Sequence, residues 1–117
     1  MKRRMLVTTG NNFDGYDVTE YLGVVRGIVV RATGIIRGLR GIFATFTGTN
    51  VRAFEEVCEE ARAQAYQRMI DHGADREADG IIAMRYDATE FSQGVTEVLA
   101  YGTAVKLIGK AQAPEQT

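Results

Sequence analysis

The stretch VRAFEEVCEEARAQAYQRMIDHG, from Val51 to Gly73, predicts a long amphipathic helix around which the rest of the chain can be placed. At ~100° per residue, a stripe of roughly 120° collects mostly apolar side chains, and the opposite side of the wheel is polar. The stripe consists of Val51, Phe54, Val57, Cys58, Ala61, Ala65, Met69 and His72, and the polar side of Glu56, Glu60, Gln64, Gln67 and Asp71. We expect this stripe to be buried and Gly73 to end the helix as its C′ residue.

The composition is that of one folded domain. A chain of 117 residues has room for a single core, and 45% hydrophobic with 25% charged residues excludes a disordered chain. The net charge of −1 gives no basic excess, so nucleic acid is not an expected partner. We expect one domain over residues 1–110 and a disordered tail at residues 111–117.

The cysteine content and the hydrophobicity profile bear on the compartment. The single cysteine, Cys58, cannot form an intramolecular disulfide. No stretch has the order of a signal peptide, and none has the ~20 apolar residues of a membrane span. The sequence therefore predicts a cytoplasmic protein without a membrane partner.

Charge is unevenly distributed along the chain. Residues 21–54 contain five arginines and no acid, whereas twelve acids and six bases follow from Glu55 onward. Two explanations stay open: solvated faces that complement each other within one fold, or a head-to-tail subunit contact or anion site on the arginine-rich segment 26–52.

The remaining chain predicts a sheet and a second helix. β-branched and apolar runs bounded by turn residues indicate strands, and apolar residues at helical spacing indicate a short helix. The expected elements are strands over Met5–Thr9, Val18–Val30, Gly80–Ala88 and Thr96–Ile108, the last two joined as a hairpin, and a short helix over Gly34–Thr47. The fold class is α+β, a curved antiparallel or mixed sheet of about four strands with one long and one short helix.

The strand Val18–Val30 is apolar on both faces and contains Gly23 and Gly27. Glycines inside a strand indicate a bulge or a place where another backbone approaches closely. A strand that is apolar on both sides is expected to be covered on both sides.

Tyr66 and Ile70 form an i, i+4 apolar pair outside the helix stripe, at about 120° and 160° from Phe54 on the wheel. In a lone subunit they should be exposed. Single exposed apolar residues are common. Together with the doubly apolar strand and the additional amphipathic helix, however, the pair favours an oligomer with Tyr66 and Ile70 at the subunit interface.

Few residues are available for catalysis. A Ser-His-Asp site would have to combine His72 with Ser92, the only serine, and no nucleophile-elbow sequence surrounds it. The segment Thr47–Asn50 lacks the lysine of a phosphate-binding loop. We therefore expect no catalytic residues and a protein that is not an enzyme.

Metal ligation within one chain is also poorly supported. Cys58 and His72 share the helix stripe but lie about 21 Å apart along the axis, so they cannot ligate one ion. Cys58 is expected to be a small buried residue, and His72 to lie at the core edge or cap the helix end. The acids Asp71, Asp75, Glu77 and Asp79 could gather a hard cation, although such a turn is usually solvated. Weak groups repeated around a symmetric ring could still build a site.

Several stretches together resemble the YbjQ family of small bacterial and archaeal proteins. These are TTG near the start, VTEYLGVVRGIVV, EEVCEEARAQAYQRMIDHGAD, DGIIAMRYD and VLAYGTAVKL, and the resemblance spans Met5 to Ile108. The loop before the long helix departs from the family, because TGTNVRAFEE stands where a Gly-Gly-Arg-Ser-like stretch is more frequent.

The resemblance implies both a fold and a function. The family is labelled "putative heavy-metal-binding domain", and its members look like dodecin-like α+β subunits that form homopentameric rings. No ligand motif carries over to named residues of this chain, so the metal ligands stay unknown, and a divalent heavy-metal ion is the implied cofactor. The expected function is a non-enzymatic, homo-oligomeric small-ligand-binding protein. The alternative is a structural module whose ring recruits a protein partner.

Overall fold

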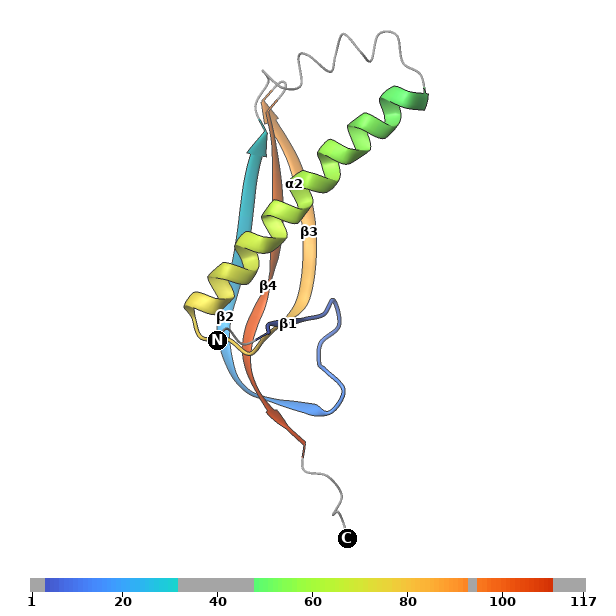
Figure 1. The fold of residues 1–117 in the computed structure, drawn as a ribbon. Helices are drawn as coiled ribbons and strands as arrows, with labels where there is room; N and C mark the ends of the chain where they lie inside the picture. Colours follow the sequence, from blue (N-terminus) through green and yellow to red (C-terminus); the bar gives the residue numbers. More distant parts are fainter. Residues whose placement is uncertain (1–3, 32–47, 93–94, 111–117) are drawn as a thin grey trace.

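The computed structural model describes residues 4–31, 48–92 and 95–110. This part of the chain contains the strands and helix of Figure 1, which are β1 (Leu6–Val7), β2 (Tyr16–Arg31), α2 (Gly48–Asp75), β3 (Gly80–Ser92) and β4 (Val95–Gly109). The predicted α+β class is confirmed. The short helix predicted over Gly34–Thr47 and the predicted tail at residues 111–117 lie outside the described residues.

The strands form one mixed sheet in the order β1-β3-β4-β2. β4 pairs antiparallel with β3 on one side and with β2 on the other, and β1 runs parallel to β3 at only two positions. The predicted hairpin is confirmed, because Ser92 of β3 pairs with Val95 of β4. In the described ranges, no helix combines the length and apolar composition that a bilayer span requires.

α2 crosses one face of the sheet diagonally, and its N-terminal end runs past the strands (Figure 1). From Glu55 to Asp75, its buried residues are spaced four apart: Ala61, Ala65, Met69 and Gly73. Because one helix turn takes 3.6 residues, side chains four positions apart form a ridge that rotates slowly around the helix axis. Such a ridge can stay in contact with the sheet along a helix that crosses the strands at an angle. The ridge packs on a core that includes Val25, Val29, Ile81, Met84, Ala100 and Ala104.

The drift of this ridge corrects one prediction of the helical wheel. Cys58 was expected in the buried stripe, but its side chain is exposed. It follows directly after Val57, the half-buried residue that continues the ridge toward the N-terminus. One residue is a rotation of ~100°, which carries Cys58 away from the sheet. The burial predicted for Ala61, Ala65 and Met69 is confirmed.

The predicted C′ residue of the helix is also corrected. Gly73 lies inside α2, where an added Cβ would be 3.2 Å from Cδ1 of Ile81. The C′ position belongs to Glu77, which has a left-handed φ of 61°. The Glu77 N–H donates to the carbonyl of Ala74 (2.9 Å), and the Ala78 N–H donates to that of Gly73 (3.0 Å). These two bonds are those of a Schellman motif.

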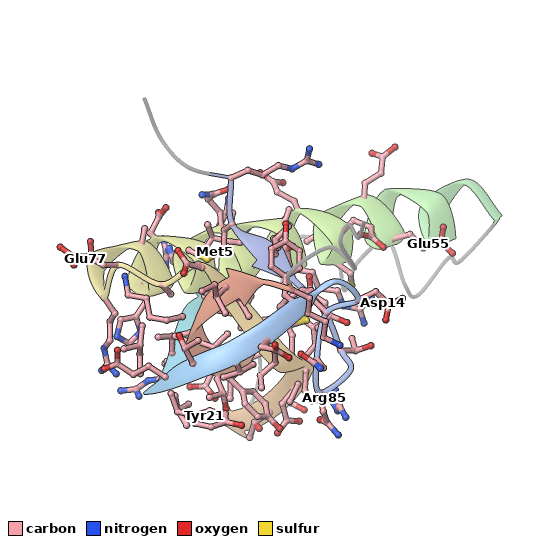
Figure 2. The ribbon with its side chains drawn as sticks, turned by 90° about the horizontal axis from the view of Figure 1, so that it is seen from below. Met5, Asp14, Tyr21, Glu55, Glu77 and Arg85 are labelled. Carbon is pink, nitrogen blue, oxygen red and sulfur yellow. The ribbon has the colours of Figure 1, made fainter. Side chains whose placement is uncertain are left out.

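β2 is covered on one face only, contrary to the expectation from its sequence. Val25 and Val29 are buried beneath α2, whereas Tyr21, Val24 and Val30 are 69%, 56% and 51% exposed. Figure 2 shows Tyr21 on the side of the sheet away from the helix. An apolar strand therefore leaves one face uncovered by the described residues.

The glycines of β2 have the predicted roles. Gly23 has a φ of 97° and lies at a register shift in the pairing with β4, which is a bulge. Gly27 lies where α2 crosses β2. A Cβ at this position would overlap the carbonyl oxygen of Ala65 and the amide nitrogen of Met69, and it would be 2.7 Å from Cβ of Arg68. The absence of a side chain at Gly27 thus sets how closely the helix lies on the sheet.

We predict that Gly27→Ala lowers the free energy of unfolding by about 2–3 kcal/mol, because the helix backbone has to move away from β2. The matched control is Gly109→Ala, where an added Cβ meets nothing within 4 Å. Urea unfolding followed by circular dichroism measures both. Equal stability of the two variants would show that α2 yields at this crossing without cost.

We predict that Glu77→Gly raises the free energy of unfolding by about 1 kcal/mol, because glycine adopts the left-handed conformation without the Cβ penalty. Glu77→Ala is the control that removes the carboxylate but retains the Cβ, and it should give no gain. The same urea titration measures both. A gain for the alanine variant would assign the effect to charge instead of backbone conformation.

Candidate functional site

Tyr66 and Ile70, the predicted interface pair, lie on the flank of α2 that faces β3. Both are half-buried, so the expectation that they are exposed in a single chain is corrected. Tyr66 packs against the core cluster, and Ile70 lines a surface hollow. The cause is again the drift of the buried ridge, which turns toward this flank near the C-terminal end of α2. Their role in an interface stays a prediction.

Two adjoining hollows run along this flank of the helix. One, of about 530 Å³, lies between α2 and β3 and is lined by Glu59, Arg62, Ala63, Tyr66, Gln67 and Tyr86. The other, of about 450 Å³, is lined by Met5, Gln67, Ile70, Asp71, Ala74, Glu77, Ala78 and Lys106. They adjoin at Gln67 and exist because α2 packs mainly on β2 and β4 and contacts β3 little. The helix therefore leaves this side of the sheet open.

The C-terminal half of β3 is an open edge of the sheet. β1 pairs only with Gly80 and Ile81, and the backbone of residues 8–10 then bonds to β3 as far as Met84. From Arg85 to Glu90 every residue is exposed, and in the described ranges no further strand pairs on this side. The Asp87 carboxylate accepts the N–H of Ala88 (2.9 Å), so one backbone donor is already occupied by a charged side chain. A charged edge of this kind discourages unspecific strand pairing.

Tyr86 is the residue of this side whose ionisation is perturbed. Partial burial raises the pKa of its phenol above the ordinary value of 10.0, and the neighbouring Tyr66 and Glu59 raise it further, whereas Arg62 lowers it. The phenol is therefore neutral at physiological pH and can donate a hydrogen bond. With Glu59 and Arg62 beside the two tyrosines, the hollow offers charged and aromatic contacts, which suit a protein surface.

The opposite side of α2 forms hydrogen bonds with the edge of β2 that does not pair with β4. Arg68 Nη1 donates to the carbonyl of Ile28 (2.6 Å), and Arg76 Nη1 donates to that of Leu22 (2.7 Å). Between them, Nδ1 of His72 accepts the N–H of Arg26 (3.1 Å). Arg68 and His72 lie one turn apart on α2, and Arg76 directly follows its last residue, so three side chains spaced by four occupy backbone groups of this edge. The edge is thereby closed to a continuous ladder with another strand.

The ring nitrogens of His72 bear directly on metal ligation. Because Nδ1 accepts a backbone N–H, the neutral ring carries its proton on Nε2. Neither nitrogen then has a free lone pair for a metal ion. The prediction that His72 lies at the core edge is confirmed, because it is half-buried, but it binds β2 instead of capping the helix end.

The other candidate ligands do not gather into a metal centre. Within the described part of the chain, no group of three or more His, Cys, Asp or Glu side chains could hold an ion. Cys58 is exposed, and Asp79 accepts the N–H of Leu107 through Oδ2 (2.9 Å). The described side chains of one copy therefore do not form a heavy-metal site by themselves.

The sequence indicates the helix flank of Tyr66 and Ile70 but not the residues that these side chains contact. Tyr86 could have been found, because it follows Met84 by two positions on the face that packs beneath α2. The contacts of Arg68, His72 and Arg76 could not have been found in this way, because they depend on where the inclined helix meets the edge of β2.

The chain matches the sequence model of the YbjQ family, described as "Putative heavy-metal-binding", over residues 5–108. It is 52% identical to a UPF0145 protein of Legionella pneumophila strain Philadelphia 1, over 86% of this chain and 96% of that one. A UPF0145 protein of Solibacter usitatus is 48% identical over 87% and 91% of the two chains. A crystal structure of a DUF74-family protein of unknown function from Pediococcus pentosaceus has the same fold, with a TM-score of 0.58 and 18% identity over 89% of this chain and 98% of that one.

We predict that the Tyr86 phenol titrates above pH 10.0 in the folded protein. The folded chain then holds this proton more tightly than the unfolded chain, so the contribution to stability is present below pH 10 and is lost as the pH rises through the raised pKa. The absorbance at 295 nm of the native protein minus that of Tyr86→Phe isolates this phenol. Glu59→Gln should lower the pKa and Arg62→Gln should raise it. Titration at or below pH 10 would contradict the assignment.

Proposed function

Because the chain belongs to the YbjQ family, we propose that it is a non-enzymatic, homo-oligomeric small-ligand-binding protein of the cytoplasm, with heavy-metal ions as its ligand class. The family description supports the ligand class, and the one unpaired cysteine supports the location. The scarcity of catalytic residue types supports a role without catalysis.

The observation that carries the oligomer is the uncovered face of the sheet. Tyr21, Val24 and Val30 are at least half exposed there, and β3 has an open edge beside the hollows of α2. An apolar face of this kind is stabilised when another protein surface removes it from water. A homopentameric ring is the form that the resemblance to the family implies, and Tyr66 and Ile70 belong to the contact in this proposal.

The heavy-metal site in this proposal is shared between copies. One copy lacks a sufficient ligand group in its described residues, and the lone pair of His72 Nδ1 is occupied. In a symmetric ring a single donor per chain recurs once in every copy, so a few copies together can supply the ligands that a soft ion requires. Such a site would release its ion when the ring dissociates.

The second candidate function is a structural module whose ring recruits a protein partner. It is favoured by the same lack of a ligand group within the described part of one chain. In that case metal uptake would be absent although the ring is intact.

We predict that the metal-stripped protein is oligomeric in light scattering and takes up Zn²⁺, Cu²⁺, Ni²⁺ or Cd²⁺ at less than one ion per chain, measured by calorimetry and elemental analysis. Tyr66→Glu with Ile70→Glu should lower the mass toward the 12.9 kDa of one chain and abolish uptake. The control, Glu55→Lys with Glu56→Lys, changes exposed positions of the same helix and should leave both unchanged.

Three results would change the proposal in different ways. An oligomer without uptake would favour the structural module, and a monomeric wild-type chain would refute assembly. Uptake of one ion per chain by the dissociated variant would place the site within a single copy. Circular dichroism confirms that each variant is folded.

A further inference from the structure

We propose that the hollow at the C-terminal end of α2 binds a small apolar zwitterion of the amino-acid class. Asp71 and Glu77 face the ammonium group of this ligand, and Lys106 faces its carboxylate. Such a site goes beyond the proposed metal binding, because one copy of the chain supplies all of these groups and no metal ion takes part.

The hollow lies between the helix and the sheet. Its volume of about 450 Å³ is in the range of sites for small molecules. Figure 2 shows Met5 beside the yellow C-terminal part of the helix and Glu77 at its end. The apolar side chains that line the hollow are Met5, Ile70, Ala74 and Ala78. The apolar group of a ligand can pack against them and leave water.

Charged groups of both signs line the same hollow. Asp71 lies on α2 and Glu77 just beyond its end, whereas Lys106 belongs to β4. Lys106 is half-buried, as is usual for a lysine whose aliphatic stem packs against protein below its charged end. Within the described part of the chain, these three side chains form no ion pair. The hollow therefore presents two negative charges and one positive charge that the described residues do not neutralise.

This combination of charges selects the class of ligand. Lys106 would repel a simple cation, and Asp71 and Glu77 would repel a simple anion. A zwitterion satisfies both signs, because its ammonium donates to the carboxylates and its carboxylate accepts from the lysine. A metal ion fits less well, since the described residues contain no group of three or more His, Cys, Asp or Glu that could hold one.

The Asp71 carboxylate is oriented by its own helix. It accepts a hydrogen bond from Nε2 of Gln67, one turn earlier on α2 (3.0 Å), and Gln67 lines the hollow as well. A carboxylate has about four acceptor positions, so this bond leaves room for a ligand. Asp71 is thus held beside the hollow without being used up.

Glu77 occupies a backbone position that is costly for a residue with a Cβ. Its φ is 61°, a conformation that glycine adopts without strain. Strained positions of this kind are frequent where a side chain serves a binding site. The carboxylate beside the hollow therefore gives a reason for a glutamate, instead of a glycine, at the end of the helix.

Calorimetry on the wild-type chain tests the site. The probes are leucine and the dipeptide leucyl-leucine, which differ in the spacing between ammonium and carboxylate. We expect at least one of them to bind at one molecule per chain. The same probe should bind about fivefold more weakly when its ammonium is acetylated or its carboxylate is amidated, because each change removes one charge pair. Absence of binding of both probes at millimolar concentration, or equal binding of charged and blocked forms, would refute the site.

Variants of the chain assign the charges. Lys106→Gln should weaken binding of the zwitterion about fivefold but should not weaken binding of the amidated probe, which has no carboxylate for the lysine. Glu77→Gly should also weaken binding of the zwitterion, although it raises the free energy of unfolding, so that loss of structure cannot explain the result.

The matched control is Glu60→Gln, which removes one charge from an exposed position of α2 outside the hollow and should bind as the wild type does. Wild-type affinity of Lys106→Gln or Glu77→Gly would show that the hollow is not the site. Light-scattering mass and metal uptake are separate measurements, so a failure of this site leaves the proposed function standing, and the converse also holds.

Discussion

The close crossing of α2 over β2 at Gly27 is the contact on which the rest of the structure depends. A side chain at this position would overlap the helix backbone, so the helix lies directly on the strand here. Small residues at Ala61 and Ala65 allow the same approach from the helix side. Because the helix is so close, the side chains of Arg68, His72 and Arg76 reach backbone groups at the edge of β2. The same position of the helix thus packs the core and closes the edge of β2.

The same crossing explains why the two sides of the molecule differ. Because α2 is held near β2, it leaves hollows on the β3 side, and Tyr66, Ile70 and Tyr86 line them. Side chains of the helix therefore occupy one edge of the sheet, whereas the other edge is exposed from Arg85 to Glu90.

The sequence was sufficient for the strands, the long helix, the hairpin and the class of the fold, because their periodicity and turn residues are local. It was insufficient for the rotation of the helix. A wheel with a fixed stripe buries Cys58 and exposes Tyr66, whereas a ridge spaced by four residues does the reverse to Cys58 and half-buries Tyr66. The sequence did not indicate the helix end at Glu77, because a left-handed glutamate has no local signature. It also did not indicate that β2 is covered on one face only, because the composition of a strand does not show what packs against each face.

The position of His72 connects the fold to the question of metal binding. Histidine and cysteine are common ligands of soft metal ions, and both occur on this helix. The His72 ring, however, accepts the N–H of Arg26 at the β2 edge. To ligate through Nε2, the ring would have to move its proton to Nδ1, which would place two donors against each other. Ligation would therefore loosen the contact that holds the helix. The described residues of one copy thus offer no ligand group beside this histidine, so the proposed binding of a soft ion requires donors from more than one copy and, in that proposal, assembly comes before binding.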